Sequence, residues 1–220
     1  MAISDIKCTC IIFDLDGTLV NSEEINARAM VEILDHLPLD AQEIIHQYKG
    51  WKLAAIVEDL SKIYDVSIPV DFETTYRDRV DQLFSTELKA FDGVEAALSC
   101  IPHQKCIASS APLQKIKHAL KVTSLGHYFN SNLFSSYEIR SWKPEPQLFL
   151  TAAARMGADP KYSIVIEDSC VGLKAAHSAK MKAIIYQPDG TILNADDLAF
   201  EHYSQLPALI ESIRELHQSG

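Results

Sequence analysis

The 220-residue sequence is poor in glycine and lacks the features that mark several classes of protein. Its 8 glycines fall below the usual share of about 7%, which favours helices over a fold built from many tight hairpins. No apolar stretch approaches the roughly 18 residues that would span a bilayer. The N-terminus has no basic segment followed by a long apolar one. We therefore expect neither a membrane-spanning helix nor a secretory signal.

Cysteines are few, and their pattern supports no cross-linked or zinc-bound framework. The five cysteines are odd in number and form no C-x-x-C pair. Cys8, Cys10 and Cys106 lie in β-like runs, where a buried thiol acts as a small hydrophobic group. We expect reduced cysteines and a cytoplasmic protein.

The chain also lacks a basic run. Its 20 Lys and Arg residues against 30 Asp and Glu residues give a net charge of −10. Proteins that bind nucleic acid or anionic membranes need a basic face, so we expect neither partner. No obligatory protein partner is evident either. An acidic chain can still bind a small phosphate through a metal ion or one placed lysine.

What the sequence does contain is an alternation of buried strands and helices. Apolar runs predict strands at 8–13, 105–108, 162–166 and 182–186, and helical spacing predicts helices at 113–122, 147–156, 171–179 and 206–216. Continuous apolar runs are typical of parallel strands covered on both faces. The pattern predicts an α/β fold with a doubly wound, Rossmann-like parallel sheet.

One long segment after the first strand does not follow this alternation. Residues from about 23 to 89 contain helical stripes and no convincing strand. A simple crossover between parallel strands needs only a dozen or more residues. We therefore expect an inserted all-helical cap domain at 21–87, with the catalytic core formed by 1–20 and 88–220.

Two carboxylates follow the first predicted strand, in the run Asp14-Leu15-Asp16-Gly17-Thr18. Open α/β sheets bind ligands beyond the carboxyl ends of their strands. Two close carboxylates repel each other unless a proton or a cation intervenes, and Mg²⁺ suits such oxygen ligands. Thr18 adds a hydroxyl and a backbone N–H. The alternative is an acidic turn in a surface loop.

Three further groups lie at or near other strand ends. Ser109 and Ser110 follow the second strand, where small residues at a strand-to-helix turn form a phosphate cradle or an ordinary helix cap. Lys143 precedes Pro144, and most lysines are simply solvated. Glu167 and Asp168 follow the next strand, where acidic loops are also common. Each group is weak evidence alone, and only the ordered set is specific.

That ordered set resembles the haloacid dehalogenase-like superfamily over nearly the whole chain. Residues 14–22 are similar to its first motif, Ser109 to the second, Lys143-Pro144 to the third and Ile166-Glu167-Asp168-Ser169 to the fourth. The helical insert resembles the caps that close over sugar-phosphate sites. Within the superfamily, the chain most resembles β-phosphoglucomutase-like phosphatases.

The resemblance implies a Mg²⁺-dependent phosphatase that acts on a small phosphorylated sugar or sugar acid. Asp14 is then the nucleophile that forms an aspartyl phosphate, and Asp16 is the general acid and base. The implied metal ligands are Asp14, the backbone carbonyl of Asp16, Asp168 and Glu167, the last directly or through water. Ser109, Ser110 and Lys143 would bind the phosphate oxygens.

Specificity is expected to reside in the cap. Residues 48–53 and 140–144 are similar to segments of enzymes that hydrolyse 6-phosphogluconate, which is the expected substrate. Lys49 and Lys52 flank Gly50, and this turn would meet a substrate carboxylate or hydroxyl; the alternative is a pair of solvated lysines. Trp51 is either a sugar-stacking platform or an apolar anchor of the cap.

Two alternative functions remain open at this point. An isomerase would move phosphate between two sugar hydroxyls, but β-phosphoglucomutases carry a histidine where this chain has Asn26. A catalytically silent binding or regulatory protein could use the same fold as a scaffold, because a fold does not fix a function.

Overall fold

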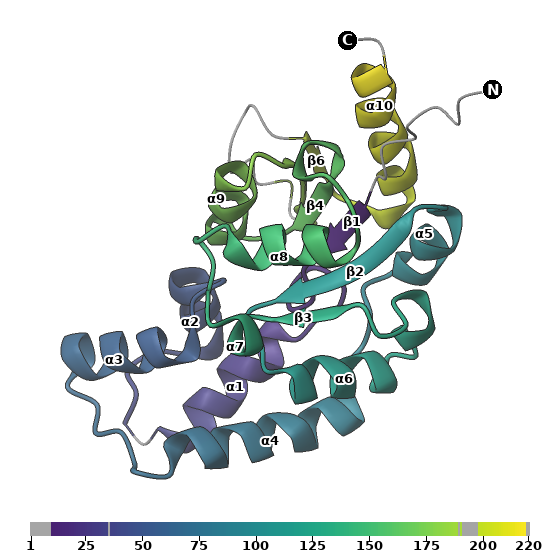
Figure 1. The fold of residues 1–220 in the computed structure, drawn as a ribbon. Helices are drawn as coiled ribbons and strands as arrows, with labels where there is room; N and C mark the ends of the chain where they lie inside the picture. Colours follow the sequence, from purple (N-terminus) through teal and green to yellow (C-terminus); the bar gives the residue numbers. More distant parts are fainter. Residues whose placement is uncertain (1–9, 35, 189, 191–197, 219–220) are drawn as a thin grey trace.

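The core of the protein is a parallel sheet of six strands. The computed structural model describes residues 10–34, 36–188, 190 and 198–218. The strands are β1 (Cys10–Phe13), β2 (Gln104–Ser109), β3 (Leu133–Ser135), β4 (Ile164–Glu167), β5 (Lys182–Tyr186) and β6 (Leu198–Phe200). Their spatial order is β3-β2-β1-β4-β5-β6, and every pair is parallel (Figure 1). This order confirms the doubly wound sheet.

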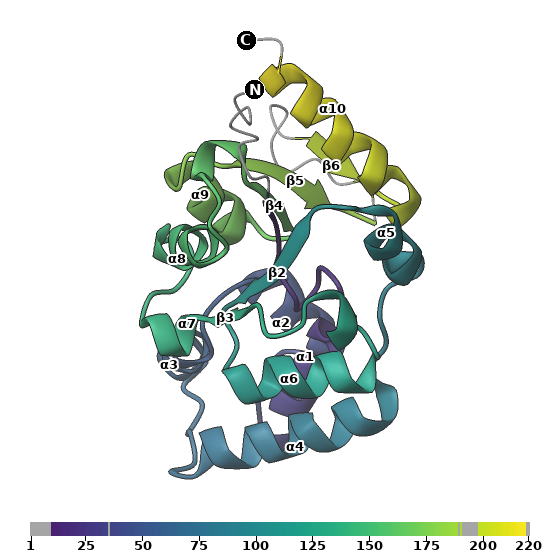
Figure 2. The same ribbon diagram turned by 45° about the vertical axis from the view of Figure 1, so that its right-hand side comes forward.

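Helices cover both faces of the sheet. They are α5 (Val94–Cys100), α6 (Leu113–Val122), α7 (Ser136–Ile139), α8 (Gln147–Arg155), α9 (Cys170–Ser178) and α10 (Leu206–Gln218). Figure 2 shows α8 and α9 on one side of the sheet and α5 and α10 on the other. Neighbouring residues of β1 follow this division, because Ile11 and Phe13 belong to one buried apolar cluster and Cys10 and Ile12 to the other.

The predicted strands are found with small shifts, and two short strands were missed. Residues 182–186 form β5 as predicted, whereas 160–162 form a 3-10 turn, so that β4 begins at Ile164. The missed strands β3 and β6 have three residues each, too few to show a pattern. Cys10 and Cys106 are buried and free, as expected. Cys8 and Thr9 lie outside the described residues.

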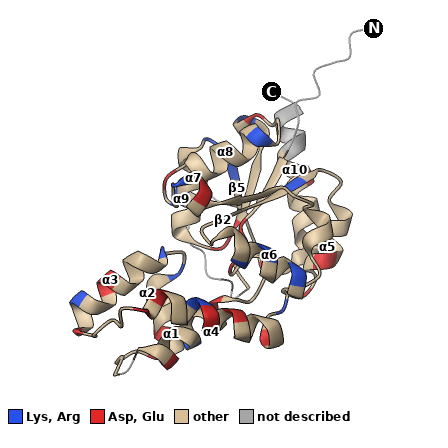
Figure 3. Ribbon diagram, turned by 60° about the horizontal axis from the view of Figure 1, so that its bottom comes forward, with Lys and Arg blue, Asp and Glu red and all other residues tan. Residues whose placement is uncertain are grey.

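Four helices occupy the segment between β1 and α5. They are α1 (Glu23–Ile33), α2 (Ala41–Tyr48), α3 (Leu53–Tyr64) and α4 (Phe72–Glu87). Figure 1 shows them together below the carboxyl ends of the strands, with α4 running beside α6. Figure 3 marks both basic and acidic residues on these helices. The helical content agrees with the predicted cap, and its limits at 21 and 87 remain a prediction.

The chain enters and leaves this helical segment through two neighbouring connections. Val20 and Ala90 form an antiparallel bridge. The N–H of Asn21 donates to the carbonyl of Lys89 at 3.0 Å, and the N–H of Phe91 donates to that of Leu19 at 3.1 Å. The two connections are therefore hydrogen-bonded to each other. Separately, none of the helices in the described ranges is long and apolar enough to cross a membrane.

Candidate active site

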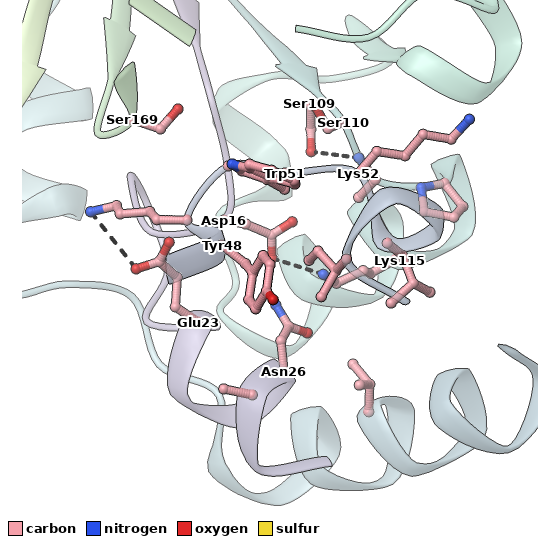
Figure 4. Close-up of a pocket in the computed structure, with 18 of the residues that line it drawn as sticks. Asp16, Glu23, Asn26, Tyr48, Trp51, Lys52, Ser109, Ser110, Lys115 and Ser169 are labelled. Atoms are coloured by element: carbon pink, nitrogen blue, oxygen red, sulfur yellow. Dashed lines mark hydrogen bonds and ion pairs between the residues drawn. The ribbon is translucent and has the colours of Figure 1, made fainter. Parts of the chain in front are cut away.

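The carboxyl ends of three central strands bring the predicted site residues together. Phe13 of β1 lies opposite Ile107 of β2 and Ile166 of β4, so the residues that follow these positions meet at one edge of the sheet. There they line a cavity of about 250 Å³ between the sheet and the helices of the insert (Figure 4). The predicted residues that line it are Asp14, Asp16, Lys49, Gly50, Lys52, Ser109, Ser110, Lys143, Glu167 and Asp168.

Lys143 is held between two buried carboxylates. It lies between α7 and α8, and its Nζ donates to Oδ1 of Asp14 and to Oε1 of Glu167. Burial opposes the charge of Lys143, but the two carboxylates outweigh it and raise its pKa. Burial also raises the pKa of Asp14 well above its usual value, Glu167 and Asp168 add to this, and Lys143 opposes it. The site therefore concentrates more negative charge than its lysine neutralises.

Both carboxylate oxygens of Glu167 accept hydrogen bonds. Its Oε2 accepts from the N–H of Asp168 at 2.9 Å, and from the N–H and the hydroxyl of Ser169, both at 2.8 Å. A Cβ at Gly172 would lie 1.9 Å from the Glu167 Cδ, so only glycine permits this packing. Burial opposes the charge of Glu167, yet Lys143 and these donors lower its pKa. These bonds hold the Glu167 side chain in place, and its binding to a metal, directly or through water, remains a prediction.

Asp168 connects the carboxyl edge of the sheet to the helical segment. Its Oδ1 accepts from the hydroxyl of Thr18 at 2.9 Å, and its Oδ2 lies 2.8 Å from Nζ of Lys49. The same Nζ is 3.8 Å from Glu23. Burial raises the pKa of Asp168, helped by Glu167 and opposed by Lys49. Burial and Asp168 raise the pKa of Glu23 to about 8.

This arrangement also involves Thr18. The residue is fully buried, it is not among those that line the cavity, and its hydroxyl is used by Asp168. Its carbonyl accepts a hydrogen bond from the hydroxyl of Tyr203, another fully buried residue. The Thr18 hydroxyl thus holds Asp168, and the expected contact between Thr18 and substrate remains a prediction.

Asp16 contacts a serine of its own motif and a lysine that was not predicted from the sequence. Ser22 donates its hydroxyl to Oδ1 of Asp16 at 2.5 Å, and Nζ of Lys115 lies 3.0 Å from the same oxygen (Figure 4). Burial opposes the charge of Asp16, but Lys115 and the hydroxyl outweigh it and lower its pKa. Lys115 lies in the first turn of α6, shortly after the predicted turn at Ser109 and Ser110. This position near the predicted site is the sequence feature that could have identified it.

The phosphate cradle predicted after β2 forms a compact turn. Ser109 is buried, and its Oγ accepts a hydrogen bond from the N–H of Ala111 at 3.1 Å. Ser110 lies beside it, shortly before the N-terminus of α6, and both serines line the cavity (Figure 4). The turn therefore presents a hydroxyl and backbone groups toward the space in front of Asp14.

The two lysines that flank Gly50 make different contacts. Lys49 reaches the carboxylates, whereas Nζ of Lys52 lies 3.7 Å from the centre of the Trp142 ring. Trp51 lines the cavity with 45% of its surface exposed, which fits a platform better than a buried anchor. A second link to the core was not predicted: Arg77 of α4 donates to the hydroxyl of Tyr137 at 2.9 Å.

The donor chemistry of the cluster fits a hard divalent cation. Burial raises the pKa values of Asp14 and Asp168, neighbouring carboxylates raise them further, and a bound cation would stabilise the charged forms. Oδ2 of Asp168 is buried and lies 2.8 Å from the Lys49 ammonium. Among the described residues, no three acidic, histidine or cysteine side chains surround one point closely enough to hold a metal.

Comparisons with known proteins agree with this geometry. The model of the haloacid dehalogenase-like hydrolase family matches residues 11–186. The chain is 36% identical over 209 residues to 6-phosphogluconate phosphatase of Escherichia coli K12, covering 92% of this chain and 95% of that protein. It is 28% identical to fructose-1-phosphate phosphatase YqaB of the same organism, covering 79% of this chain and 94% of the relative.

Solved structures show the same fold. A haloacid dehalogenase-like protein of unknown function from Agrobacterium tumefaciens superposes with a TM-score of 0.81 at 26% identity, over 93% of this chain and 98% of that one. A hydrolase of this family from Deinococcus radiodurans, solved with bound phosphate and sodium, gives a TM-score of 0.74 at 25% identity, over 94% and 97%.

Proposed function

The chain belongs to the haloacid dehalogenase-like hydrolase family, and from this premise we propose that it is a Mg²⁺-dependent phosphatase whose substrate is 6-phosphogluconate. At the coarser level it is a phosphatase of phosphorylated sugars. The observation that carries the finer proposal is the cavity itself, which is lined by Asp14, Asp16 and Asp168 together with the cationic side chains Lys49 and Lys52. A phosphate at the carboxylates and a second acid at the lysines would suit a phosphorylated sugar acid.

The first chemical step is attack by Asp14 on phosphorus. Lys143 contacts Oδ1 of Asp14, so the second oxygen, Oδ2, is the one we assign to the attack. A bond forms between this oxygen and phosphorus while the bond between phosphorus and the sugar oxygen breaks, giving an aspartyl phosphate. Lys143 and the turn at Ser109 and Ser110 stabilise the charge that develops on the phosphoryl oxygens.

Asp16 handles the proton in both halves of the reaction. In its protonated form it gives a proton to the departing sugar oxygen. As a carboxylate it then takes a proton from the water that attacks the aspartyl phosphate, which releases phosphate and restores Asp14. Its contacts with Ser22 and Lys115 hold the carboxyl group in place for both transfers.

Asp14, Asp168 and the backbone carbonyl of Asp16 are the groups we assign to hold Mg²⁺. The ion supplies positive charge that offsets the repulsion between the anionic nucleophile and the anionic phosphate. Glu167 contributes by holding Lys143 and the loop that carries Asp168, since its oxygens are already hydrogen-bonded. The isomerase alternative is disfavoured, because this chain has Asn26 at the position where β-phosphoglucomutases carry a histidine.

Phosphate release from purified protein tests the proposal. We expect higher kcat/KM for 6-phosphogluconate than for glucose 6-phosphate, loss of activity on chelation and recovery with Mg²⁺. Asp14→Asn removes the nucleophile with little change in shape, so turnover should fall to background while the melting temperature stays at or above that of the wild type. Equal rates for the two sugar phosphates would contradict the substrate, and near-wild-type activity of D14N would contradict the mechanism.

A further inference from the structure

Asn26 lies at the start of α1, directly below the proposed acid and base. Its N–H donates to the carbonyl of Ser22 at 2.9 Å, so these two residues occupy one face of the first helical turn. The hydroxyl of Ser22 donates to Asp16. The Asn26 side chain is among the hydrogen-bonding groups that lower the pKa of Asp16, and it lines the cavity (Figure 4).

Asn26 carries a buried amide oxygen beside Asp16. A carboxylate only accepts hydrogen bonds, so a contact of the amide with Asp16 uses Nδ2 and leaves Oδ1 free for another donor. This Oδ1 is buried and has no hydrogen-bond partner among the described residues. A buried acceptor without a donor is costly, and such atoms in native structures call for a missing partner.

We propose that Oδ1 of Asn26 accepts a hydrogen bond from a substrate hydroxyl, the one on the carbon next to the phosphorylated carbon. The inference rests on the proposed function, in which Asp16 stands at the ester oxygen. Asn26 lines the cavity near Asp16 (Figure 4), so in this proposal it meets the part of the substrate that follows the ester carbon. Asn26 is then a specificity-determining residue of the cap.

This assignment names a class of substrate. In an open-chain polyol phosphate or sugar-acid phosphate, the carbon next to the ester carbon carries a free hydroxyl, which donates to Oδ1. In a pyranose 6-phosphate, the same position carries the ring oxygen, which accepts and cannot donate. The unsatisfied acceptor therefore favours open-chain substrates and penalises rings, because two facing acceptors leave the buried oxygen unpaired.

The test compares two substrates that differ in that hydroxyl, 6-phosphogluconate and its 5-deoxy analogue, with p-nitrophenyl phosphate as a reference. Wild-type protein should prefer the hydroxyl-bearing substrate in kcat/KM by about 10- to 100-fold, as expected for a lost hydrogen bond in a buried site. Asn26→Leu keeps the volume and removes the acceptor, so the preference should shrink to within about 3-fold. Glu24→Gln, an exposed change on the same helix, should keep it.

Each outcome either supports or contradicts the contact between Asn26 and the substrate hydroxyl. Equal hydrolysis of the two substrates by an active wild type, or an equal fall for all three substrates in N26L, would overturn the assignment to Asn26. If wild-type protein releases no phosphate from 6-phosphogluconate while hydrolysing the aryl ester, the substrate proposal fails, and this proposal fails with it. Should N26L unfold at assay temperature, Asn26→Ala and the wild-type comparison alone give the same decision.

Discussion

Nζ of Lys49 lies 2.8 Å from Oδ2 of Asp168, so a residue of the helical insert neutralises one of the buried carboxylates at the sheet edge. Asp168 is almost fully buried, whereas about a third of the Lys49 side chain is exposed to solvent. Lys49 therefore competes with any cation that binds at Asp168. Lys49 was expected to contact substrate, and it also lies beside the proposed metal site.

Replacing Lys49 by Met should strengthen Mg²⁺ binding. Removing a positive charge beside Asp168 makes the potential at the site more negative, and we expect an affinity gain of about 10-fold, or roughly 1.4 kcal/mol. Isothermal titration of Mg²⁺ into the substrate-free protein measures it. Lys52→Met is the matched control, because Lys52 lies over Trp142 instead. Unchanged or weaker Mg²⁺ binding in K49M would argue against competition.

Gly50→Ala should impair closure of the insert over the sheet. A Cβ at Gly50 would lie 2.6 Å from Cγ2 of Val171 and 2.8 Å from the Ser169 Oγ. We expect kcat/KM for 6-phosphogluconate to fall about 10-fold or more, with a smaller loss for p-nitrophenyl phosphate, which has no polar groups to reach the cap.

Gly157→Ala controls for backbone strain in that experiment. Both glycines have a positive φ, 79° at Gly50 and 67° at Gly157, so alanine costs each about 1–2 kcal/mol. A Cβ at Gly157 meets nothing within 4 Å. Both variants should lose stability in thermal unfolding, and only G50A should lose substrate discrimination. Similar kinetics in the two variants would refute a role for the contact.

Asp16→Asn should show a loss that depends on the leaving group. The amide cannot donate the proton that a sugar alkoxide needs, whereas a nitrophenolate departs without one. We expect kcat/KM to fall about 100- to 10,000-fold for 6-phosphogluconate, and the first-step burst with p-nitrophenyl phosphate to fall far less. Stopped-flow detection of nitrophenolate measures that burst. Equal losses for both substrates would contradict the acid role of Asp16.

Tyr203→Phe should destabilise the protein without removing any group from the cavity. The Tyr203 hydroxyl donates to the carbonyl of Thr18 inside the protein, and the variant leaves that carbonyl unpaired. The expected cost is about 1–3 kcal/mol in the free energy of unfolding, measured by urea denaturation. Leu198→Ala, at an exposed position of β6, is the control. A loss below that of L198A would mean the hydrogen bond contributes little.

The sheet and the site were predictable because their signals are local. A continuous apolar run marks each long central strand, and the polar residue that follows it must lie at the carboxyl edge. Asp14, Ser109 and Asp168 were found in this way. The strands β3 and β6 lie at the sheet edges with three residues each, and so few residues carry no periodicity.

The contacts of individual side chains were not predictable from spacing. Thr18 sits in the expected motif, yet its hydroxyl turns to Asp168 because the turn packs against the residues after β4. Lys115 reaches Asp16 from a helix that is distant in sequence. Lys49 was expected at the substrate, but the surplus of buried negative charge attracts its ammonium group. Such outcomes depend on tertiary packing and on the total charge of the site.

The paired connections at Val20 and Ala90 have a consequence for how this architecture can vary. Since the two ends of the helical segment are hydrogen-bonded neighbours, the chain leaves the core and returns to it at a single place. Helices could be lengthened, exchanged or removed beyond that place without shifting β1 or β2. We therefore expect the chemistry and the choice of substrate to reside in separable parts of one chain.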